Sequence, residues 1–599
     1  MFFSEYVIEA IASVNYLEKD RDTHAVSLLK GAAEKAENEV DSHILDVISG
    51  CLTMTYRSKE QDFAPIYVER GGRRSFGLED LKESDVEILR LVTQVTESSW
   101  LRTRLSHIVW TITKEYHYGQ FAVTGYLDAY QKVFDPVHWV SCYENIETAY
   151  HIAFMMGKKT EIFRKTRMAI FQKLVEMNGT DPLFLSVQMI KLICKDLETE
   201  QLLKCASILE ILLHKNTDPE NDNTHLADES FSNLEAVYKR LKREDEIKVA
   251  KERYADYYGA VARKKAAQKD YIHAVIFMKR ACKLYSALNR DKMIELRLEM
   301  EPWQKLTLES LQPFTMSIDV RETADIVEQM FVDLTLSEAI VQFGRIASIY
   351  KVDEVKQRIL QEKNEYFLSS MFGNSLLNDQ GQLVQELPPI TITDIEENSD
   401  VLRKYMVRHV AEQRGLLDSI PLQMAFKYLK QFGTISEDAL DFLVQDNAII
   451  PDNRIEIIRE GLCLALNGRL YTAMHILQPQ TENIFRHLVK MCGDTVTFLK
   501  EDGTEEYKSL SNLFKSNKLL ECYDNDLIFV FQSIMDEPIG ENLRNLNAHG
   551  LLEPDVGGGT GALCFLSMLI MLLSLYSEKA LLIRMNLAKR EANEMEADI

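Results

Sequence analysis

Glycine and proline are both scarce in this 599-residue chain, which contains 25 Gly and 13 Pro. Average proteins contain about 7% Gly and 5% Pro, so both counts are low. Few helix-breaking residues in a long chain argue against an all-β protein and favour helices. At 46% hydrophobic and 27% charged, the chain has an ordinary globular composition that can bury a core. We therefore expect an all-α fold.

Cysteine and histidine are present, but without the spacing of a metal site. The nine Cys are scattered, and no two of them stand at a C-x-x-C spacing. The 13 His form no H-E-x-x-H or comparable pattern. The sequence therefore predicts reduced thiols, no metal and no cofactor, as in a cytoplasmic protein.

Positive charge is also in deficit, with 69 Lys and Arg against 92 Asp and Glu, a net charge of -23. Because phosphate neutralisation dominates non-specific nucleic-acid affinity, such a chain is a poor general polyanion binder. Any nucleic-acid role would need a local basic cleft. Residues 239–269, with eleven basic and five acidic side chains, are the exception. We expect a solvated helix face there, and guidance of RNA is the alternative.

One long and mostly apolar segment, residues 562–576, carries no charge. Its 15 residues are fewer than the roughly 20 that span a bilayer. We expect a buried core helix and no stable membrane insertion, with a membrane segment as the alternative.

Apolar residues spaced by three and four predict successive helices along most of the chain. Residues 254–288 fit paired antiparallel helices of tetratricopeptide type, which indicates a solenoid-like helical array. Alternation around Asp502 and Gly503 predicts a β-hairpin within residues 494–508. We expect four parts: an amino-terminal helical domain at 1–214, a helical-repeat-like region at 230–310, a helical middle region at 311–451 with a loop-rich connector at 372–400, and a carboxy-terminal bundle at 452–599.

The most informative residues for chemistry are Arg544 and His549. They stand five apart on a short expected helix that follows Pro538 and Gly540, and Gly550 can cap its end in the left-handed conformation. At 3.6 residues per turn their side chains point about 140° apart, so they do not share a face. Two copies across a two-fold axis would bring both pairs into one cleft.

Such a cleft suits RNA cleavage without a metal. The neutral imidazole of a histidine such as His549 can accept the proton of the ribose 2′-OH, since histidine is the side chain that commonly exchanges protons near physiological pH. The Arg544 guanidinium can hold the phosphate and stabilise its growing charge. The second copy's imidazole would protonate the leaving 5′ oxygen, giving a 2′,3′-cyclic phosphate. Asn545 and Asn547 would help to orient these groups.

A purely structural interpretation of the same residues stays open. Arg544 would then pair with a carboxylate such as Glu541 or Glu553, and the histidine would merely pack. The bare spacing is weak evidence, because Arg102 and His107 repeat it elsewhere in the chain.

The strings around this motif resemble the HEPN superfamily (higher eukaryotes and prokaryotes nucleotide-binding). The similar branch includes the endoplasmic-reticulum-membrane-associated RNA degradation proteins and their bacterial relatives. The matching strings are residues 450–454, 459–462, 474–486 and 540–551, with the expected hairpin before the last. The resemblance covers roughly residues 315–580. It implies an all-α bundle, dimerisation across the Arg/His helices and metal-independent ribonuclease activity in many members, whereas others only bind nucleotides or partners.

Within the string 474–486, the spacing of three polar residues also predicts contacts along one helix face. His475, Glu482 and Arg486 are separated by seven and four residues, so they lie near one face of a helix. Glu482 and Arg486 form a favourable i,i+4 ion pair. Glu482 could orient Arg544 or His549, and Arg486 could add positive potential to the cleft. The alternative is a buried ion pair that braces the bundle, and Arg454 and Arg459 likewise fit either bracing charges or the rim of a site.

The sequence thus predicts a cytoplasmic homodimer in which a carboxy-terminal HEPN-like bundle cleaves RNA. The amino-terminal array would sense or position another molecule, such as a protein partner. A toxin-like or antiviral role is the analogy that the resemblance offers. The alternative is a non-catalytic adaptor, in which the array binds protein and the bundle only dimerises.

Overall fold

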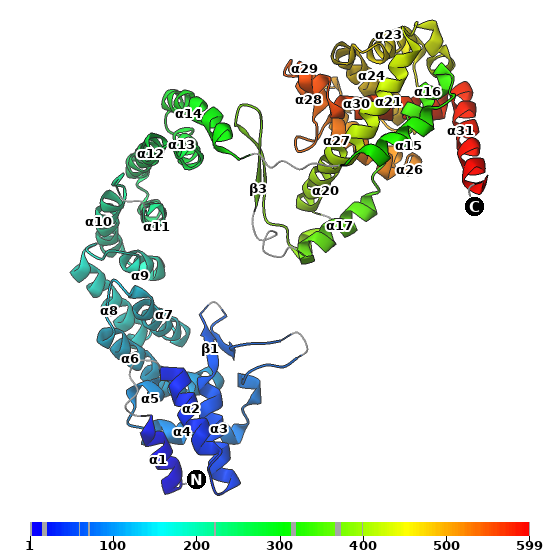
Figure 1. Cartoon of the computed structure of the whole chain (residues 1–599). Coiled ribbons are helices and arrows are strands. Elements are labelled where there is room, and N and C mark those ends of the chain that lie inside the picture. The colour runs from blue at the N-terminus through cyan, green and yellow to red at the C-terminus, as the bar shows by residue number, and fades with distance from the viewer. Residues whose placement is uncertain are drawn as a thin grey trace. The chain divides into compact units, whose positions relative to one another are not determined.

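The computed structural model describes residues 3–14, 21–58, 60–69, 72–220, 223–312, 319–365, 373–397 and 399–597. The described residues are mostly helical, as the sequence predicts, with three two-stranded antiparallel hairpins among them. The chain divides into two compact units, Met1–Gln304 and Lys305–Ile599 (Figure 1). Each unit has its own hydrophobic core and is described by itself.

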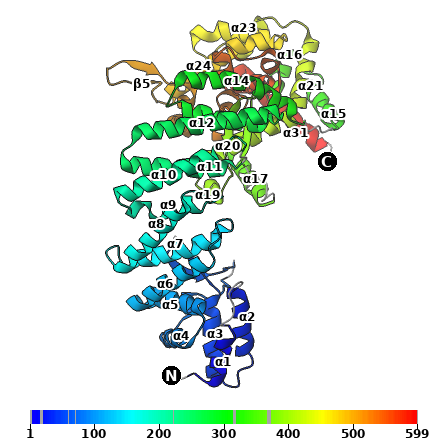
Figure 2. The same cartoon turned by 90° about the vertical axis from the view of Figure 1, so that its left-hand side faces the viewer.

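Unit 1 is an array of helices in which sequence neighbours pack antiparallel (Figures 1 and 2). Its core is continuous from Val7 to Met300, so the expected parts 1–214 and 230–310 share one core. Its elements are α1 (Glu5–Ser13), α2 (Arg21–Ala33), α3 (Glu39–Leu52), β1 (Met54–Arg57), β2 (Asp62–Pro65), α4 (Glu83–Val95), α5 (Ser99–Thr113), α6 (Tyr116–Lys132), α7 (Trp139–Met156), α8 (Glu161–Met177), α9 (Leu185–Ile193), α10 (Thr199–Asn216), α11 (Thr224–Leu241), α12 (Glu244–Ala267), α13 (Tyr271–Tyr285) and α14 (Arg290–Ser310), whose last residues cross into unit 2.

The expected helix pair within residues 254–288 is α12 and α13. Their facing sides bury small alanines, which let the two helices approach closely. The turn between them begins at Gln268, and Asp270 caps the second helix by accepting a hydrogen bond from the backbone N–H of His273. The tetratricopeptide-like pattern therefore marks a real helical hairpin.

The β1–β2 hairpin interrupts a stretch that the sequence predicts to be all helical. Its strands pair from Met54 opposite Pro65 to Arg57 opposite Asp62. Phe63 and Met54 are buried, and the Phe63 ring lies 4.7 Å from the ring of His107 on α5. Strands of four residues are too short to show an alternation of apolar and polar side chains in the sequence. Their conformation depends on which side chains a neighbouring helix buries.

Unit 2 is a helical bundle with two small hairpins. Its core draws on both expected parts, 311–451 and 452–599. Its elements are α15 (Arg321–Phe331), α16 (Leu336–Phe343), α17 (Val352–Glu365), β3 (Asn374–Leu377), β4 (Leu383–Leu387), α19 (Ile392–Glu396), α20 (Asp400–Gln413), the π-helical turn η3 (Arg414–Asp418), α21 (Ser419–Leu429), α22 (Asp441–Val444), α23 (Ile455–Leu466), α24 (Leu470–Met491), β5 (Thr497–Leu499), β6 (Glu505–Tyr507), α25 (Leu510–Phe514), α26 (Asn517–Cys522), α27 (Asn525–Met535), α28 (Leu543–Ala548), α29 (Pro554–Gly557), α30 (Thr560–Tyr576) and α31 (Glu578–Ala597).

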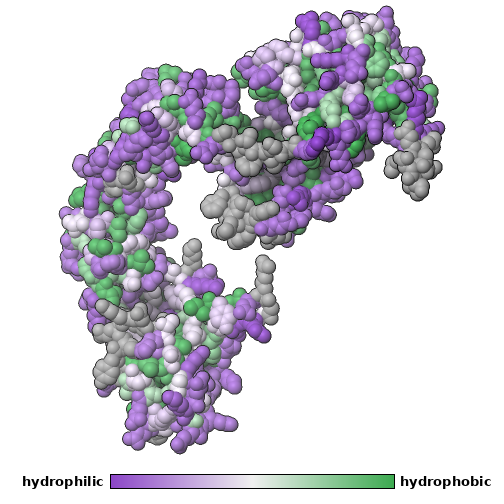
Figure 3. All heavy atoms as spheres, viewed as in Figure 1, coloured by the Kyte–Doolittle hydropathy of each residue, from purple (hydrophilic) through white to green (hydrophobic). Residues whose placement is uncertain are grey.

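Helix α30 is the centre of unit 2. Thirteen of its residues are buried, and it packs against helices that include α16, α21, α24 and α27. By length and composition the stretch Pro554–Tyr576 could cross a membrane, and 72% of its most apolar window is buried inside the unit. The apolar run thus forms the bundle's core helix. The surface in Figure 3 is mostly hydrophilic, with scattered apolar residues.

Unit 2 contains one hairpin where the sequence predicts it, within residues 494–508, and another in the loop-rich connector. Strands β5 and β6 flank a turn in which Gly503 has φ +82°, as the Asp-Gly pair predicts (Figure 2). Strands β3 and β4 fall within the connector 372–400, of which residues 372 and 398 lie outside the described part of the chain.

Candidate functional site

Helix α28, which carries Arg544, is short and closely defined at both ends. Asn542 starts it in the left-handed conformation, with φ 53°. At its end the N–H of Gly550 donates to the carbonyl of Asn547 (3.1 Å), and the N–H of Leu551 donates to that of Leu546 (2.7 Å). With φ +67° at the glycine, this is a Schellman cap, and the glycine cap inferred from the sequence is confirmed.

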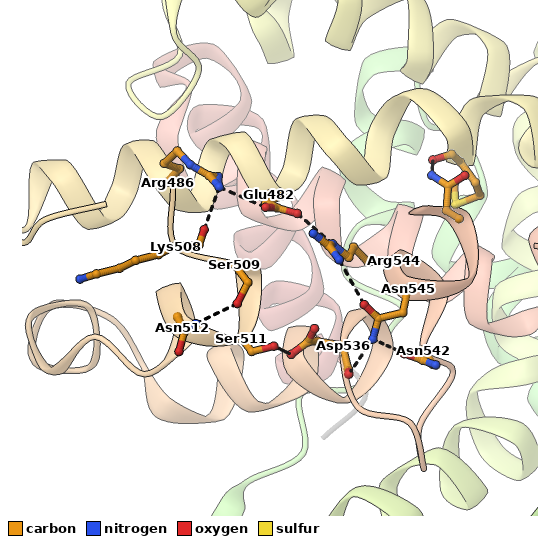
Figure 4. Close-up of polar contacts among 12 residues, drawn as sticks. Glu482, Arg486, Lys508, Ser509, Ser511, Asn512, Asp536, Asn542, Arg544 and Asn545 are labelled. Carbon is orange, nitrogen blue, oxygen red and sulfur yellow. Dashed lines mark hydrogen bonds and ion pairs between the residues drawn. The ribbon is translucent and has the colours of Figure 1, made fainter. Parts of the chain in front are cut away.

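Arg544 is held by Glu482 of the long helix α24 (Figure 4). Its Nε donates to Glu482 Oε2 at 2.9 Å, and its Nη1 donates to Asn545 Oδ1 at 3.2 Å. The Arg544 side chain keeps 28% of its surface exposed, whereas Glu482 keeps 15%. A half-buried carboxylate thus fixes the guanidinium in one orientation and leaves part of it open to solvent.

Glu482 also accepts a hydrogen bond from Arg486, one turn further along α24. Arg486 Nη2 donates to Glu482 Oε1 at 3.1 Å and to the carbonyl of Lys508 at 3.0 Å. Its guanidinium carbon lies 5.3 Å from the centre of the Tyr507 ring, a cation–π contact. Arg486 therefore ties the β5–β6 hairpin to α24, and the expected i,i+4 pair exists.

The two asparagines of the motif anchor α28. Asn545 Nδ2 donates to Asn542 Oδ1 at 2.7 Å and to the carbonyl of Asp536 at 3.3 Å. Asn547 Nδ2 donates to the carbonyl of Met474 on α24 at 3.3 Å. Both amides thus fix the position of the helix.

His549 caps the end of α28, and its side chain is exposed. Its backbone N–H donates to the carbonyl of Asn545 at 3.1 Å. Within the described ranges its imidazole forms no hydrogen bond or ion pair, and it is not joined to Arg544. The structure therefore places the arginine in an ordered ionic contact and leaves the histidine open at the surface.

The structural alternative named Glu541 and Glu553 as partners of Arg544, and the structure joins Arg544 to neither of them. Glu541 instead pairs with Arg414, a fully buried residue of the π-helical turn. Arg414 Nε donates to Glu541 Oε1 at 2.8 Å, and its Nη1 donates to Ser533 Oγ at 2.9 Å. Sequence reasoning missed this pair, because 127 residues separate its members and neither stands in a recognisable pattern.

The segment before α28 lies tightly on α27. A Cβ added at Gly540 would lie 1.8 Å from the carbonyl oxygen of Ser533, so only glycine fits there. Nearby, burial raises the pKa of the Asp418 carboxyl, which accepts hydrogen bonds from Ser348 (2.7 Å) and Tyr350 (3.2 Å). Buried polar groups of η3 and α27 thus hold the segment that leads into α28.

The other charged candidates lie outside the contacts of Arg544. Arg459 is buried, and its guanidinium contacts Asp441 and Glu456 at 3.0 and 2.8 Å. Arg454 begins α23 as its N-cap residue.

Six basic residues of the run 239–269 form ion pairs with neighbouring carboxylates, which fits the solvated-face interpretation: Lys239, Arg243, Lys248, Arg253, Arg263 and Lys264.

The second Arg/His pair of the chain lies on α5 of unit 1, where the histidine is buried and the arginine is exposed. His107 is fully buried between aromatic rings, and burial, with the charges of Arg104 and Lys114, lowers its pKa well below the usual value. Arg102 donates to the carbonyls of Thr93 and Thr96. Among the residues that the structure describes, no group of three or more His, Cys, Asp or Glu could hold a metal ion.

The fold defines this chain as an all-α protein that joins a helical array to a helical bundle. Residues 5–165, which lie in unit 1, match the model of a family described as a domain of unknown function, DUF7380. No curated protein matches the chain. The family match ends in α8, so it does not reach the motif on α28.

Proposed function

We propose that unit 2 is a metal-independent endoribonuclease of HEPN type. The observation that carries the proposal is that one six-residue helix carries a fixed, partly exposed Arg544 near its start and an exposed His549 at its end, whose imidazole has no partner among the described residues. The resemblance of residues 540–551 to HEPN motifs adds to it. RNA is the substrate class, because the chemistry uses the 2′-OH.

The roles follow from the chemistry of the two groups. His549 removes the proton of the ribose 2′-OH, and solvent access lets it exchange that proton afterwards. Arg544 presents planar N–H donors to the phosphate and stabilises the charge that grows on its oxygens. Its Nε already donates to Glu482 and its Nη1 to Asn545, so the N–H groups that remain would meet the substrate in a fixed orientation.

Dimerisation belongs to the proposal. A second copy would bring another α28 to the same cleft, so that both motifs line one RNA path. In an acidic chain this doubling supplies local positive charge that one copy does not offer. The array of unit 1 would then select RNA or bind a protein partner, and the whole protein would act in the cytoplasm without stable membrane insertion.

Cleavage of a generic RNA in excess EDTA tests the function. Wild-type protein should cleave, and Arg544→Ala and His549→Ala should each lower the rate by about 10²-fold or more. His225→Ala, in unit 1, is the matched control and should cleave as the wild type does. Equal cleavage by His549→Ala and wild type would contradict the assignment, and clean solubility without detergent would support the localisation.

A non-catalytic adaptor is the second candidate. It is favoured by the ionic contacts of Glu482 with Arg544 and Arg486, which would brace the bundle even without catalysis. If no RNA is cleaved and a dimer nevertheless binds protein partners, the adaptor is correct.

A further inference from the structure

The end of α28 and the chain that follows it are bonded to one turn of α24 at two points. At the first, Asn547 Nδ2 donates to the carbonyl of Met474 at 3.3 Å. At the second, the Tyr471 hydroxyl donates to the carbonyl of Leu552 at 3.2 Å. The segment between the two points therefore runs along residues 471–474.

Two histidines belong to this stretch, one on each side of the contact between α24 and the segment 547–552. His549 lies between the two tied residues of its own segment, and His475 directly follows Met474 on α24. Both side chains are exposed. The His475 ring meets the Tyr471 ring edge to face, with centres 4.9 Å apart. Within the described part of the chain, neither imidazole forms a hydrogen bond or an ion pair.

The same face of α24 also leads to the arginine. His475 and Glu482 are seven residues apart, two helical turns or about 10 Å along the axis. Glu482 accepts a hydrogen bond from Arg544, so α28 runs beside α24. The guanidinium of Arg544 therefore contacts α24 two helical turns after His475. One side of α24 therefore carries His475 and Glu482, which holds the guanidinium of Arg544, and His549 follows at the end of α28 in the same chain.

We propose that His475 is the general acid of the cleavage step and acts in the same chain as His549. This inference rests on the proposed function and deepens it. The sequence offered the second copy's imidazole as proton donor, whereas the geometry points to an imidazole already beside the motif. The second copy would then complete the walls of the RNA path rather than the proton transfer.

The step balances with groups that the chain carries. The 2′-OH gives its proton to neutral His549, and the 2′ oxygen forms a bond to phosphorus. The bond from phosphorus to the 5′ oxygen breaks, and protonated His475 gives its proton to that oxygen. The products are a 2′,3′-cyclic phosphate and a 5′-OH, and solvent returns each imidazole to its starting protonation state.

A substrate with a 5′-bridging sulfur tests the assignment directly. Its thiolate leaves without a proton, so it does not need a general acid. On ordinary RNA, His475→Ala should lose about 10²-fold or more of the rate. On the sulfur-bridged RNA the same variant should regain most of that loss, whereas His549→Ala should stay slow on both substrates. A merely structural role for His475 would lower both rates together, and that result would overturn the proposal.

The controls separate this inference from the function beneath it. His487→Ala alters another histidine of α24 and should cleave both substrates as wild type does. If wild type cleaves and His475→Ala is unaffected on ordinary RNA, the His475 role is wrong while the nuclease stands. If wild type cleaves neither substrate, both proposals fall.

Discussion

The Nε atom of Arg544 lies 2.9 Å from Oε2 of Glu482, a residue 62 positions earlier in the chain. The other oxygen of the same carboxylate accepts from Arg486 at 3.1 Å. One half-buried carboxylate thus orders two guanidinium groups, and the orientation of the motif arginine depends on it.

Glu482→Gln should separate orientation from packing. The amide keeps the shape of the side chain but loses the charge that fixes Arg544. We expect RNA cleavage to fall by about 10²-fold, because small displacements of a positioned group have effects of that size. Glu460→Gln, an exposed change on α23, is the control and should leave the rate unchanged. Unchanged cleavage by Glu482→Gln would show that Arg544 does not need this partner.

The buried Arg414–Glu541 pair should matter for stability. Arg414→Met leaves Glu541 without its partner and should lower the free energy of unfolding of unit 2 by about 3–5 kcal/mol. Arg414→Met combined with Glu541→Leu should recover most of that loss, since no uncompensated charge stays behind. Hydrogen exchange of α27 peptides in urea measures both.

The exposed pair Arg408–Glu412 on α20 provides the comparison. Arg408→Met should cost less than about 1 kcal/mol. An equal loss of unfolding free energy in Arg408→Met and Arg414→Met would contradict the role of Arg414 in holding the segment before α28.

Gly550→Ala tests the cap that sets the position of His549. An alanine at φ +67° is strained by about 1–2 kcal/mol, so α28 should exchange its amide hydrogens faster. Gly415→Ala is the matched control, because open space surrounds its added methyl group and its backbone is helical. That variant should keep or slightly raise stability. Slower exchange in Gly550→Ala would argue against the cap.

His107 gives unit 1 a specific pH dependence. Its pKa is lowered in the folded state, chiefly by burial, so below about pH 6.5 the unfolded chain takes up a proton that the folded chain does not. Stability should therefore fall as the pH decreases below 6.5, by up to about 1.4 kcal/mol per pH unit for this group. Above that pH the group contributes no slope.

His107→Phe should remove this part of the slope. All four Trp lie at or before residue 303, so tryptophan fluorescence during urea unfolding reports unit 1 alone. Tyr126→Phe is the control for the bond that Tyr126 makes to the His107 ring, and it should leave the slope in place. An identical slope in His107→Phe and wild type would contradict the assignment.

The sequence predicts the helices well, because each follows from apolar spacing that a neighbouring helix satisfies. It also predicts the Asp502–Gly503 turn and the Gly550 cap, since each requires a backbone conformation that glycine supplies. These features depend on residues close together in the chain, so a local pattern contains them.

Long-range partners were much harder to predict. The sequence placed Glu482 near the motif, but it could not choose among Glu482, Glu541 and Glu553 as the partner of Arg544, because packing of distant helices decides that choice. The pairing of Glu541 with Arg414 follows from the π-helical turn, which no residue pattern marks. The β1–β2 hairpin was not predicted for a similar reason, because its strands are ordered by contacts with α5.

The most direct test of the central claim is the chemical end left on a cleaved RNA, read by mass spectrometry from a reaction in EDTA. We expect fragments that end in a 2′,3′-cyclic phosphate with wild type, none with His549→Ala, and no cleavage at a nucleotide whose 2′-OH has been replaced by hydrogen. Cleavage at that 2′-deoxy position, or cyclic-phosphate ends from His549→Ala at the wild-type rate, would contradict it.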